Sequence, residues 1–210
     1  MIAAALLAGL CADLYDDTKA SAWVHSWETD NVHIAHAQAE GADILVFRGS
    51  VEVQDWIRNA NAFPEWHPNL GFVHAGFAAG LDEVMPEVQA AVGDRVVITG
   101  HSLGGARARI LAALRVIEGW PVEQVTVFGS PRPGFANIAR VIQKSGMSHS
   151  SYRNRNDPVP LVPGVLPFWE HTEAWTPIDA RPADTDFAPL RDHDIGLYVS
   201  GLSAPCTQAP

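Results

Sequence analysis

The sequence predicts an α/β fold, with a central and mostly parallel sheet between two layers of helices. Three observations support this fold class. Short apolar runs such as Val96–Ile98 and Val122–Phe128 have the β-branched composition of buried parallel strands. Helix-forming segments such as Ala106–Leu114 alternate with these runs along the chain. A glycine-flanked serine, in Gly100–Gly104, lies where a strand passes into a helix.

Length and composition limit the class of protein. The chain has 210 residues, of which 47% are hydrophobic, so we expect one domain with a real core over residues 1–210. Its formal net charge of −10 disfavours a nucleic-acid partner and attraction to anionic headgroups, but it does not disfavour a neutral, apolar substrate. Because no apolar run approaches the roughly 20 residues of a membrane span, we expect no transmembrane segment.

The first residues allow two interpretations. Met1–Leu10 is as apolar as a secretion signal, but it has no basic start, and three aspartates follow it closely. We therefore expect a packed helix over Ile2–Tyr15, with a poorly defined signal as the alternative, so localisation stays open between cytoplasmic and secreted. The two cysteines, Cys11 and Cys206, are either free thiols or one bridge.

The N-terminal part of the sheet is predicted to be antiparallel. Trp23–Trp27 and Val32–Gln38 read as short strands, and after a turn Ile44–Phe47 is a buried run, which together indicate a hairpin. Arg48-Gly49-Ser50 follows directly. A polar loop therefore begins at the carboxyl end of a strand, where open α/β sheets place their chemistry.

The next segment, Val51–Pro68, has two interpretations of equal weight. It is either a surface loop with some core anchors, or a short lid and hydrophobic rim beside a pocket. Its two prolines restrict any helix to its first part. The candidate lid or rim residues are its large apolar side chains, Trp56, Ile57, Phe63 and Trp66.

The remaining elements follow in alternation, with no repeat or linker that would divide the chain. Val73–Phe77 opens a helix that runs to about Val92, and Val96–Ile98 is the central strand. The further predicted elements are a strand at Val122–Phe128, a helix at Phe135–Lys144, a strand at Ser150–Asn154, an outer strand at His171–Ile178, a polar connection at Arg181–Pro189 and a last helix at Asp192–Gly201 that contains His193.

The pentapeptide Gly100-His101-Ser102-Leu103-Gly104 has the Gly-x-Ser-x-Gly pattern of a nucleophile elbow. In such a turn the serine takes a strained conformation, and a Cβ at either glycine would collide with a neighbouring element. The Leu103 N–H and the positive end of the following helix point to the same place as the serine hydroxyl. A phosphate-binding loop is disfavoured, because no Gly-Lys-Ser/Thr follows.

A serine needs a base within hydrogen-bond reach and an acid that orients this base. Asp157, in a turn before Pro158, and His193 supply both in the chain order Ser, Asp, His. His149 and His171 remain competitors for the base, of which His171 is the stronger but fits a structural or pocket-wall role. The competing aspartates, interpreted as solvated surface carboxylates, are Asp179, Asp192 and Asp194.

These residues give the chain a resemblance to the class 3 lipases, a fungal-lipase-like branch of the α/β-hydrolases. The resemblance runs from Ile44 onward, through Leu45–Ser50, Asp55–Asn59, Val73–Phe77, Gly100–Gly105, Phe128–Gly134, Asn156–Pro160 and Asp192-His193. It implies Ser102 as nucleophile, Asp157 as orienting acid and His193 as base, with Ser50 and the Leu103 N–H as oxyanion hole. It also implies a lid within Val51–Pro68. Family members often carry a disulfide near their ends, which makes a bridge between Cys11 and Cys206 worth testing. The implied mechanism requires no metal or organic cofactor.

The expected activity is therefore hydrolysis of a carboxylic ester, in the first place by a lipase acting on acylglycerols through an acyl-enzyme. A phospholipase A1 or a feruloyl-type esterase is the alternative within the enzymes. A non-catalytic lipid-binding homologue is the alternative of another class, which the intact serine, aspartate and histidine set disfavours. The expected partners are a neutral lipid or other ester substrate and, transiently, a lipid interface.

Overall fold

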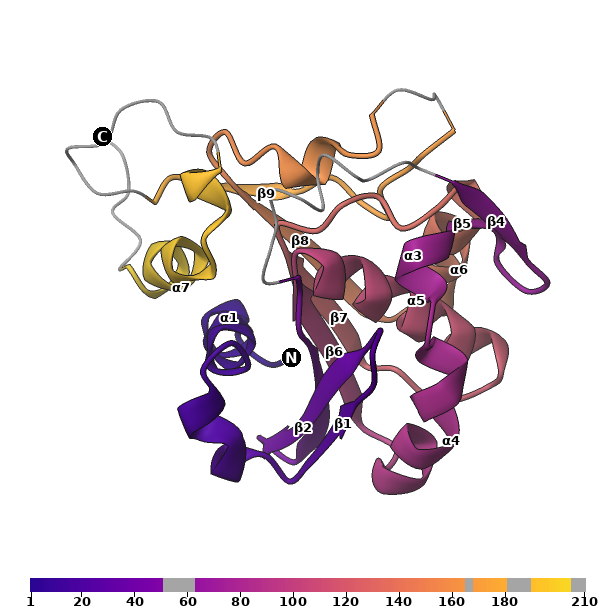
Figure 1. Cartoon of the computed structure of the whole chain (residues 1–210), viewed down its shortest axis with the longest axis horizontal. Coiled ribbons are helices and arrows are strands. Elements are labelled where there is room, and N and C mark those ends of the chain that lie inside the picture. Colours follow the sequence, from indigo (N-terminus) through magenta and orange to yellow (C-terminus); the bar gives the residue numbers. More distant parts are fainter. Residues whose placement is uncertain (51–62, 165–167, 181–189, 205–210) are drawn as a thin grey trace.

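A mixed sheet runs through the molecule (Figure 1), which we describe from a computed structural model over residues 1–50, 63–164, 168–180 and 190–204. Within these residues it has seven strands in the order β1-β2-β3-β6-β7-β8-β9. β2 runs antiparallel to both β1 and β3, whereas the strands from β3 to β9 in this order are parallel to one another, as predicted. The strands are β1 (His25–Glu28), β2 (His33–Ala39), β3 (Ala42–Phe47), β6 (Val96–His101), β7 (Gln124–Phe128), β8 (Ser148–Asn154) and β9 (Thr176–Ile178).

Helices cover both faces of this sheet (Figure 1), which confirms the predicted α/β class. One face carries α1 (Ala4–Asp13) and α7 (Ile195–Ser203), which pack against each other and the sheet. The other face carries α3 (Ala75–Ala78), α4 (Leu81–Ala91), α5 (Leu103–Ile117) and α6 (Ala136–Ser145). Short 3-10 helices lie at Asp17–Ala22, Val159–Leu161 and Arg191–His193.

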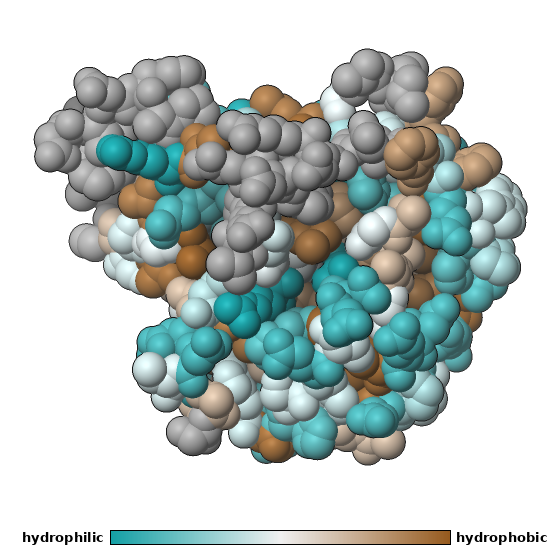
Figure 2. Space-filling model, in the orientation of Figure 1, coloured by the Kyte–Doolittle hydropathy of each residue, from teal (hydrophilic) through white to brown (hydrophobic). Residues whose placement is uncertain are grey.

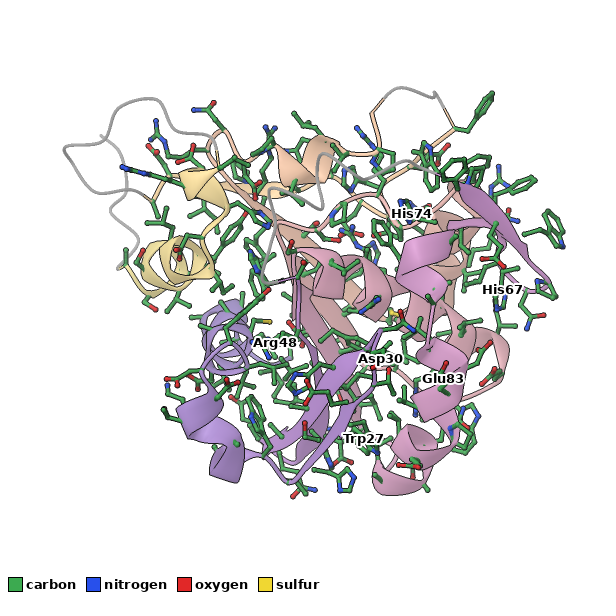
Figure 3. All side chains as sticks on the ribbon, viewed as in Figure 1. Trp27, Asp30, Arg48, His67, His74 and Glu83 are labelled. Carbon is green, nitrogen blue, oxygen red and sulfur yellow. The ribbon has the colours of Figure 1, made fainter. Side chains whose placement is uncertain are left out.

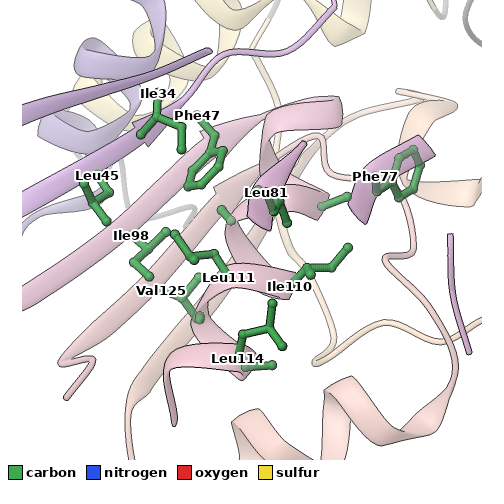
Figure 4. Close-up of a cluster of buried hydrophobic side chains, with 14 of the residues drawn as sticks. Ile34, Leu45, Phe47, Phe77, Leu81, Ile98, Ile110, Leu111, Leu114 and Val125 are labelled. Atoms are coloured by element: carbon green, nitrogen blue, oxygen red, sulfur yellow. The ribbon is translucent and has the colours of Figure 1, made fainter. Parts of the chain in front are cut away.

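Alternation along the strands divides the core into two layers. Leu45 and Phe47 of β3 point towards α5, whereas Ile44 and Val46 point towards α1. In the first layer, side chains of the sheet pack against Leu111 and its neighbours on α5 (Figure 4). Since β6 and most of α5 are buried, the turn between them is held by packing on both sides.

A small second sheet lies in the region of the predicted lid. It consists of β4 (Pro64–His67) and β5 (Gly71–His74), and single bridges join Val73 to Gly134 and Gly134 to Glu170. The end of the predicted lid-like segment is thus a strand. Residues 51–62, with Trp56 and Ile57, lie outside the described residues, as do 181–189.

The predicted continuous helix from Val73–Phe77 to Val92 is wrong. Gly71–His74 is a strand, and the helical part is divided into α3 and α4 by Gly80, which takes a φ of 79°. A side chain is strained in this left-handed conformation, so Gly80 both ends α3 and starts α4.

The outer strand is shorter than the predicted His171–Ile178, because only Thr176–Ile178 pairs with β8. The residues before it turn inward to polar partners. The Glu173 carboxylate binds the buried Arg109 guanidinium at 2.7 Å, and the His171 ring contacts the Pro160 carbonyl at 2.6 Å. These contacts replace a ladder of backbone hydrogen bonds.

The last helix does not contain His193, contrary to the prediction. Arg191–His193 is a single 3-10 turn, and α7 starts at Ile195 because the Asp194 side chain caps it by accepting the Gly196 N–H at 2.7 Å. His193 therefore lies on a turn held at the start of a helix.

At the N-terminus, α1 lies within the predicted range and is anchored along its length. The Gln124 side chain binds the backbone of Ile2, and the free thiol of Cys11 contacts the Thr99 hydroxyl at 3.6 Å. Burial raises the pKa of this thiol to about 12, so it stays protonated. Cys206 lies outside the described residues. No helix in the described part of the chain is long and apolar enough to cross a membrane.

Candidate active site

Ser102 lies at a sharp turn between β6 and α5. Its φ of 58° and ψ of −132° are strained for a residue with a side chain. The turn needs two glycines because backbones meet there. A Cβ on Gly100 would lie 2.5 Å from the Gly104 carbonyl carbon, and one on Gly104 would lie 2.7 Å from the Phe47 carbonyl carbon. This local geometry is that of a nucleophile elbow.

Asp157 and His193 form a buried pair. The His193 Nδ1 lies 2.7 Å from the Asp157 Oδ2, with relative exposures of 3% and 0%. The carboxylate also accepts the Val159 N–H at 2.9 Å and the Tyr198 hydroxyl at 2.5 Å. With these donors the carboxylate is held as an acceptor, and the imidazole is fixed with its Nδ1 towards Asp157.

Tyr198 was not singled out from the sequence. It lies on α7, and its ring is fully buried. Burial raises the pKa of its hydroxyl well above the usual range, and the adjacent Asp157 charge raises it further. The hydroxyl therefore remains a proton donor to Asp157. The helix predicted over Asp192–Gly201 contains this residue. However, no sequence pattern distinguishes Tyr198 from the apolar residues around it in α7.

The elbow and the buried pair meet at the end of β7. The Ser102 N–H donates to the Phe128 carbonyl at 3.0 Å. A Cβ on the next residue, Gly129, would lie 2.8 Å from the Asp157 Oδ2 and 2.9 Å from the His193 Nδ1. Ser102 and the Asp157–His193 pair therefore lie on either side of Phe128 and Gly129.

Two polar atoms of Ser102 and His193 have no hydrogen-bond partner within the described residues. The Ser102 Oγ and the His193 Nε2 are both buried, and neither has a hydrogen-bond partner among the residues that the structure describes. Because Nδ1 is occupied by Asp157, Nε2 is the ring nitrogen free to take a proton from a serine hydroxyl. The sequence-predicted residues Ser102, Asp157 and His193 therefore come together from three distant segments.

The 48–50 loop, which we define as Arg48–Ser50, passes directly beside the serine. A Cβ on Gly49 would lie 2.9 Å from the Ser102 Cβ and 2.7 Å from the His101 carbonyl oxygen. Ser50 follows and is partly buried. On the other side, Leu103 is the first residue of α5, so its N–H belongs to the helix turn whose donors have no partner within the helix.

The competing residues have other partners. His171 contacts the Pro160 carbonyl, and burial, followed by the Arg109 charge, lowers its pKa to about 4. His149 contacts the carbonyl of Met147 at 3.3 Å. Asp194 caps α7, and Asp179 pairs with Arg155. The interpretation of Asp192 as a solvated carboxylate is wrong, because it is 7% exposed and accepts the Asn156 N–H at 3.1 Å.

Large apolar side chains are exposed at the small sheet of β4 and β5. Phe63 and Trp66, two of the predicted rim residues, are 69% and 63% exposed. Figure 2 shows hydrophobic residues in the upper part of this face, above a largely hydrophilic lower part. Across the small sheet, four aromatic rings follow one another with centroids 5.2 to 5.7 Å apart: Trp66, Phe72, Phe135 and Phe168.

No group of three or more His, Cys, Asp and Glu side chains is arranged to hold a metal ion within the part of the chain that the structure describes.

Comparison with known proteins adds three findings. A model of the family "Lipase (class 3)" matches residues 44–166. The secreted mono- and diacylglycerol lipase 1 of Fusarium solani is 33% identical over 198 residues, which are 86% of this chain and 57% of that protein. A lipase of Rhizomucor miehei is 31% identical over 159 residues, which are 67% of this chain and 44% of that protein.

The fold agrees with these findings. The native propeptide complex of Rhizomucor miehei lipase superimposes with a TM-score of 0.72 at 26% identity, over 84% of this chain and 67% of that one. The chain thus spans about half the length of the curated relatives described above.

Proposed function

This chain belongs to the class 3 lipase family, and on that premise we propose that it is a serine carboxylic ester hydrolase, a lipase that cleaves acylglycerol esters through an acyl-enzyme. The family match supports hydrolysis of a lipid ester in general. We further propose that residues 1–210 act as one hydrolase domain, with a short lid-like segment at about 51–68 beside the site.

The observation that carries the proposal is the buried arrangement around Gly129. The 2.7 Å contact of His193 with Asp157 fixes the imidazole, and the two unpartnered atoms of the cluster, Ser102 Oγ and His193 Nε2, are the pair that nucleophilic catalysis requires. An unpartnered buried hydroxyl and imidazole nitrogen are costly, which supports a role in which a substrate and a proton transfer use them.

The mechanism follows from these roles. The Ser102 Oγ attacks the ester carbonyl carbon while His193 Nε2 takes its proton, and Asp157 stabilises the imidazolium. The oxyanion of the tetrahedral intermediate is held by Ser50 and by the Leu103 N–H at the positive end of α5. His193 then gives its proton to the leaving alcohol. Water, activated by His193, attacks the acyl-enzyme and releases the carboxylic acid and free Ser102.

The exposed aromatic side chains support a lipid substrate. Phe63 and Trp66 expose large apolar rings at the small sheet, which a bridge joins to Gly134 in the loop after β7. Aromatic rings are favoured at water–lipid interfaces. With a net charge of −10, the protein is better suited to a neutral lipid surface than to an anionic one. Transient contact with such an interface is therefore part of the proposal.

Hydrolysis of p-nitrophenyl acyl esters tests the activity directly. We expect turnover by the wild type and a loss of at least about a thousandfold in Ser102→Ala, since removal of a catalytic serine has effects of this size or larger. Equal rates in both proteins would indicate the non-catalytic lipid-binding homologue. A series of triglyceride, phospholipid and feruloyl esters then separates a lipase from a phospholipase A1 or a feruloyl-type esterase.

A further inference from the structure

A chain of hydrogen bonds joins the two sides of the site through a residue of the N-terminal region. Tyr15 follows α1, and its hydroxyl oxygen lies 3.0 Å from the backbone nitrogen of Gly49 and 3.1 Å from His101 Nδ1. The other ring nitrogen, His101 Nε2, lies 2.9 Å from the His193 carbonyl oxygen. The chain therefore runs from the 48–50 loop to the turn that carries His193.

The direction of every hydrogen bond in this chain is fixed by its ends. The Gly49 N–H can only donate, and the His193 carbonyl can only accept. Hence His101 carries its proton on Nε2, and its Nδ1 accepts from the Tyr15 hydroxyl. Burial, with the neighbouring His193, lowers the pKa of His101 well below the usual range, which keeps this ring neutral as the arrangement needs.

Packing holds both rings in place. The Tyr15 ring meets the His101 ring edge-on, with centroids 5.8 Å apart, and the Arg48 guanidinium (Figure 3) lies 5.6 Å from the centre of the Tyr15 ring. The His101 ring stacks on the His193 ring at 4.5 Å. A displacement of Tyr15 therefore moves groups on both sides of Ser102.

We propose that Tyr15 and His101 are positioning residues that hold the 48–50 loop and the His193 turn at a fixed distance across Ser102. In this role their side chains act through the Gly49 N–H and the His193 carbonyl, and not on the Ser102 hydroxyl. The Tyr15 hydroxyl fixes Gly49, the backbone neighbour of the oxyanion residue Ser50, and His101 fixes the backbone of the base. This inference rests on the proposed function and assigns a part of the site to the region before the family match.

The test is a double-mutant cycle in ester hydrolysis. Tyr15→Phe removes the hydroxyl and keeps the ring. His101→Gln keeps an amide donor for the His193 carbonyl and loses the acceptor for Tyr15. We expect each single variant to lower kcat by about 10- to 100-fold, a smaller loss than that of an oxyanion donor, with KM changed less than about threefold. Because both remove the same link, the double variant should lose little more than the worse single one.

Two controls keep the result specific. Tyr152→Phe removes a hydroxyl from another partly buried tyrosine, on β8, and should leave kcat within twofold. Thermal unfolding shows whether each variant is folded. Losses that multiply in the double variant, or a folded Tyr15→Phe with wild-type kcat, would overturn the inference.

A readout without turnover separates this inference from the proposed function. In the ¹⁵N spectrum of the histidine rings, His101 should be protonated on Nε2, and Tyr15→Phe should shift its Nδ1 resonance. If the wild type has no esterase activity but this shift occurs, the proposed function fails and the hydrogen-bond chain stands. An unchanged Nδ1 resonance in Tyr15→Phe contradicts the chain, whatever the activity.

Discussion

The two sides of the site are built differently. On the acid–base side, Asp157 and His193 are almost fully buried, and the carboxylate accepts from a ring nitrogen, a hydroxyl and a backbone N–H. On the side that we propose holds the oxyanion, Gly49 is buried but Arg48 and Ser50 are only partly buried. The Arg48 N–H donates to the His33 carbonyl, and the Tyr15 hydroxyl accepts the Gly49 N–H. The first side is over-determined by contacts within the last third of the chain, whereas Gly49 on the second side depends on Tyr15, which lies 34 positions earlier.

This difference predicts how each side fails. Loss of one contact on the acid–base side should leave the rest of the pair in place, so only the catalytic groups themselves are indispensable there. On the oxyanion side, a small change should displace the whole loop.

Substitution of the base should have the largest effect. We expect His193→Ala to lower kcat by about 10⁴-fold or more, because it removes the imidazole that we propose takes the Ser102 proton. His171→Ala should keep much of the activity, since its ring contacts the Pro160 carbonyl instead. Ester hydrolysis by the two purified variants measures this, and the reverse result would reassign the base.

Asp157→Asn should lower kcat by about 10³- to 10⁴-fold at neutral pH, because an amide can present its N–H to Nδ1 and stabilise the wrong tautomer of His193. Asp179→Asn is the matched control, since its side chain is 78% exposed. Steady-state kinetics with p-nitrophenyl esters gives the comparison. Equal losses in both variants would count against the orienting role of Asp157.

Gly49→Ala tests the oxyanion side without touching a catalytic group. Its Cβ would collide with the Tyr15 hydroxyl and lie 2.9 Å from the Ser102 Cβ, so the loop must move. We expect kcat to fall by about 10²-fold, as when an oxyanion donor is displaced. Gly9→Ala, where nothing lies within 4 Å of the new Cβ, should leave kcat unchanged. Wild-type kcat in folded Gly49→Ala would contradict the close approach.

Tyr198→Phe should have a smaller effect, about 10-fold or less on kcat. It removes one hydrogen bond to a charged group, but Asp157 keeps the Val159 N–H and the His193 ring. Steady-state kinetics across pH 6 to 9 measures this effect. Because the raised pKa keeps the Tyr198 hydroxyl protonated over this range, the ratio of wild-type to variant kcat should not change with its titration. A loss as large as that of Asp157→Asn would show that the acid–base side is not over-determined.

A residue outside both sides should affect stability alone. His74 (Figure 3) is 6% exposed, its ring stacks on Phe77 at 3.8 Å, and burial lowers its pKa to about 4. Between pH 6.5 and 4 the unfolded chain binds the extra proton, so the free energy of unfolding falls by up to about 3 kcal/mol as the pH falls, and no further below pH 4.

Replacing this ring should remove that pH dependence. Urea unfolding at pH 7 and pH 4.5 measures the free energy of unfolding at each pH. Between these pH values, His74→Phe should lose less of this free energy than the wild type. His25→Phe, at an exposed position, should lose as much as the wild type. Equal losses in all three proteins would contradict the cause assigned to the shift.

The sequence predicted most of the parallel core, because its strands have strong local patterns, and it predicted that Ser102 lies at the turn between β6 and α5. Apolar runs mark β3, β6 and β7, and Gly100 and Gly104 mark a turn that only glycines allow. The errors lie where tertiary contacts override local preference. Gly80 divides a stretch with helical periodicity into two helices. Glu173 binds Arg109, so the residues around it do not pair as a strand. Asp194, and not Asp192, caps the start of α7.

Tyr15 and Tyr198 could not be identified in the same way. Each acts through one hydroxyl that reaches a partner at least 34 positions away, Gly49 in one case and Asp157 in the other. Neither has a spacing that distinguishes it from a tyrosine of the core. Only the packing of α1 and α7 on the same face of the sheet brings these hydroxyls to the site.

Labelling with a fluorophosphonate, which reacts preferentially with activated serines, shows directly whether Ser102 is a nucleophile. We predict one label per chain, located on Ser102 by peptide mass spectrometry, with labelling absent in Ser102→Ala and slowed by orders of magnitude in His193→Ala. Label on another serine, or unchanged labelling in Ser102→Ala, would contradict the account.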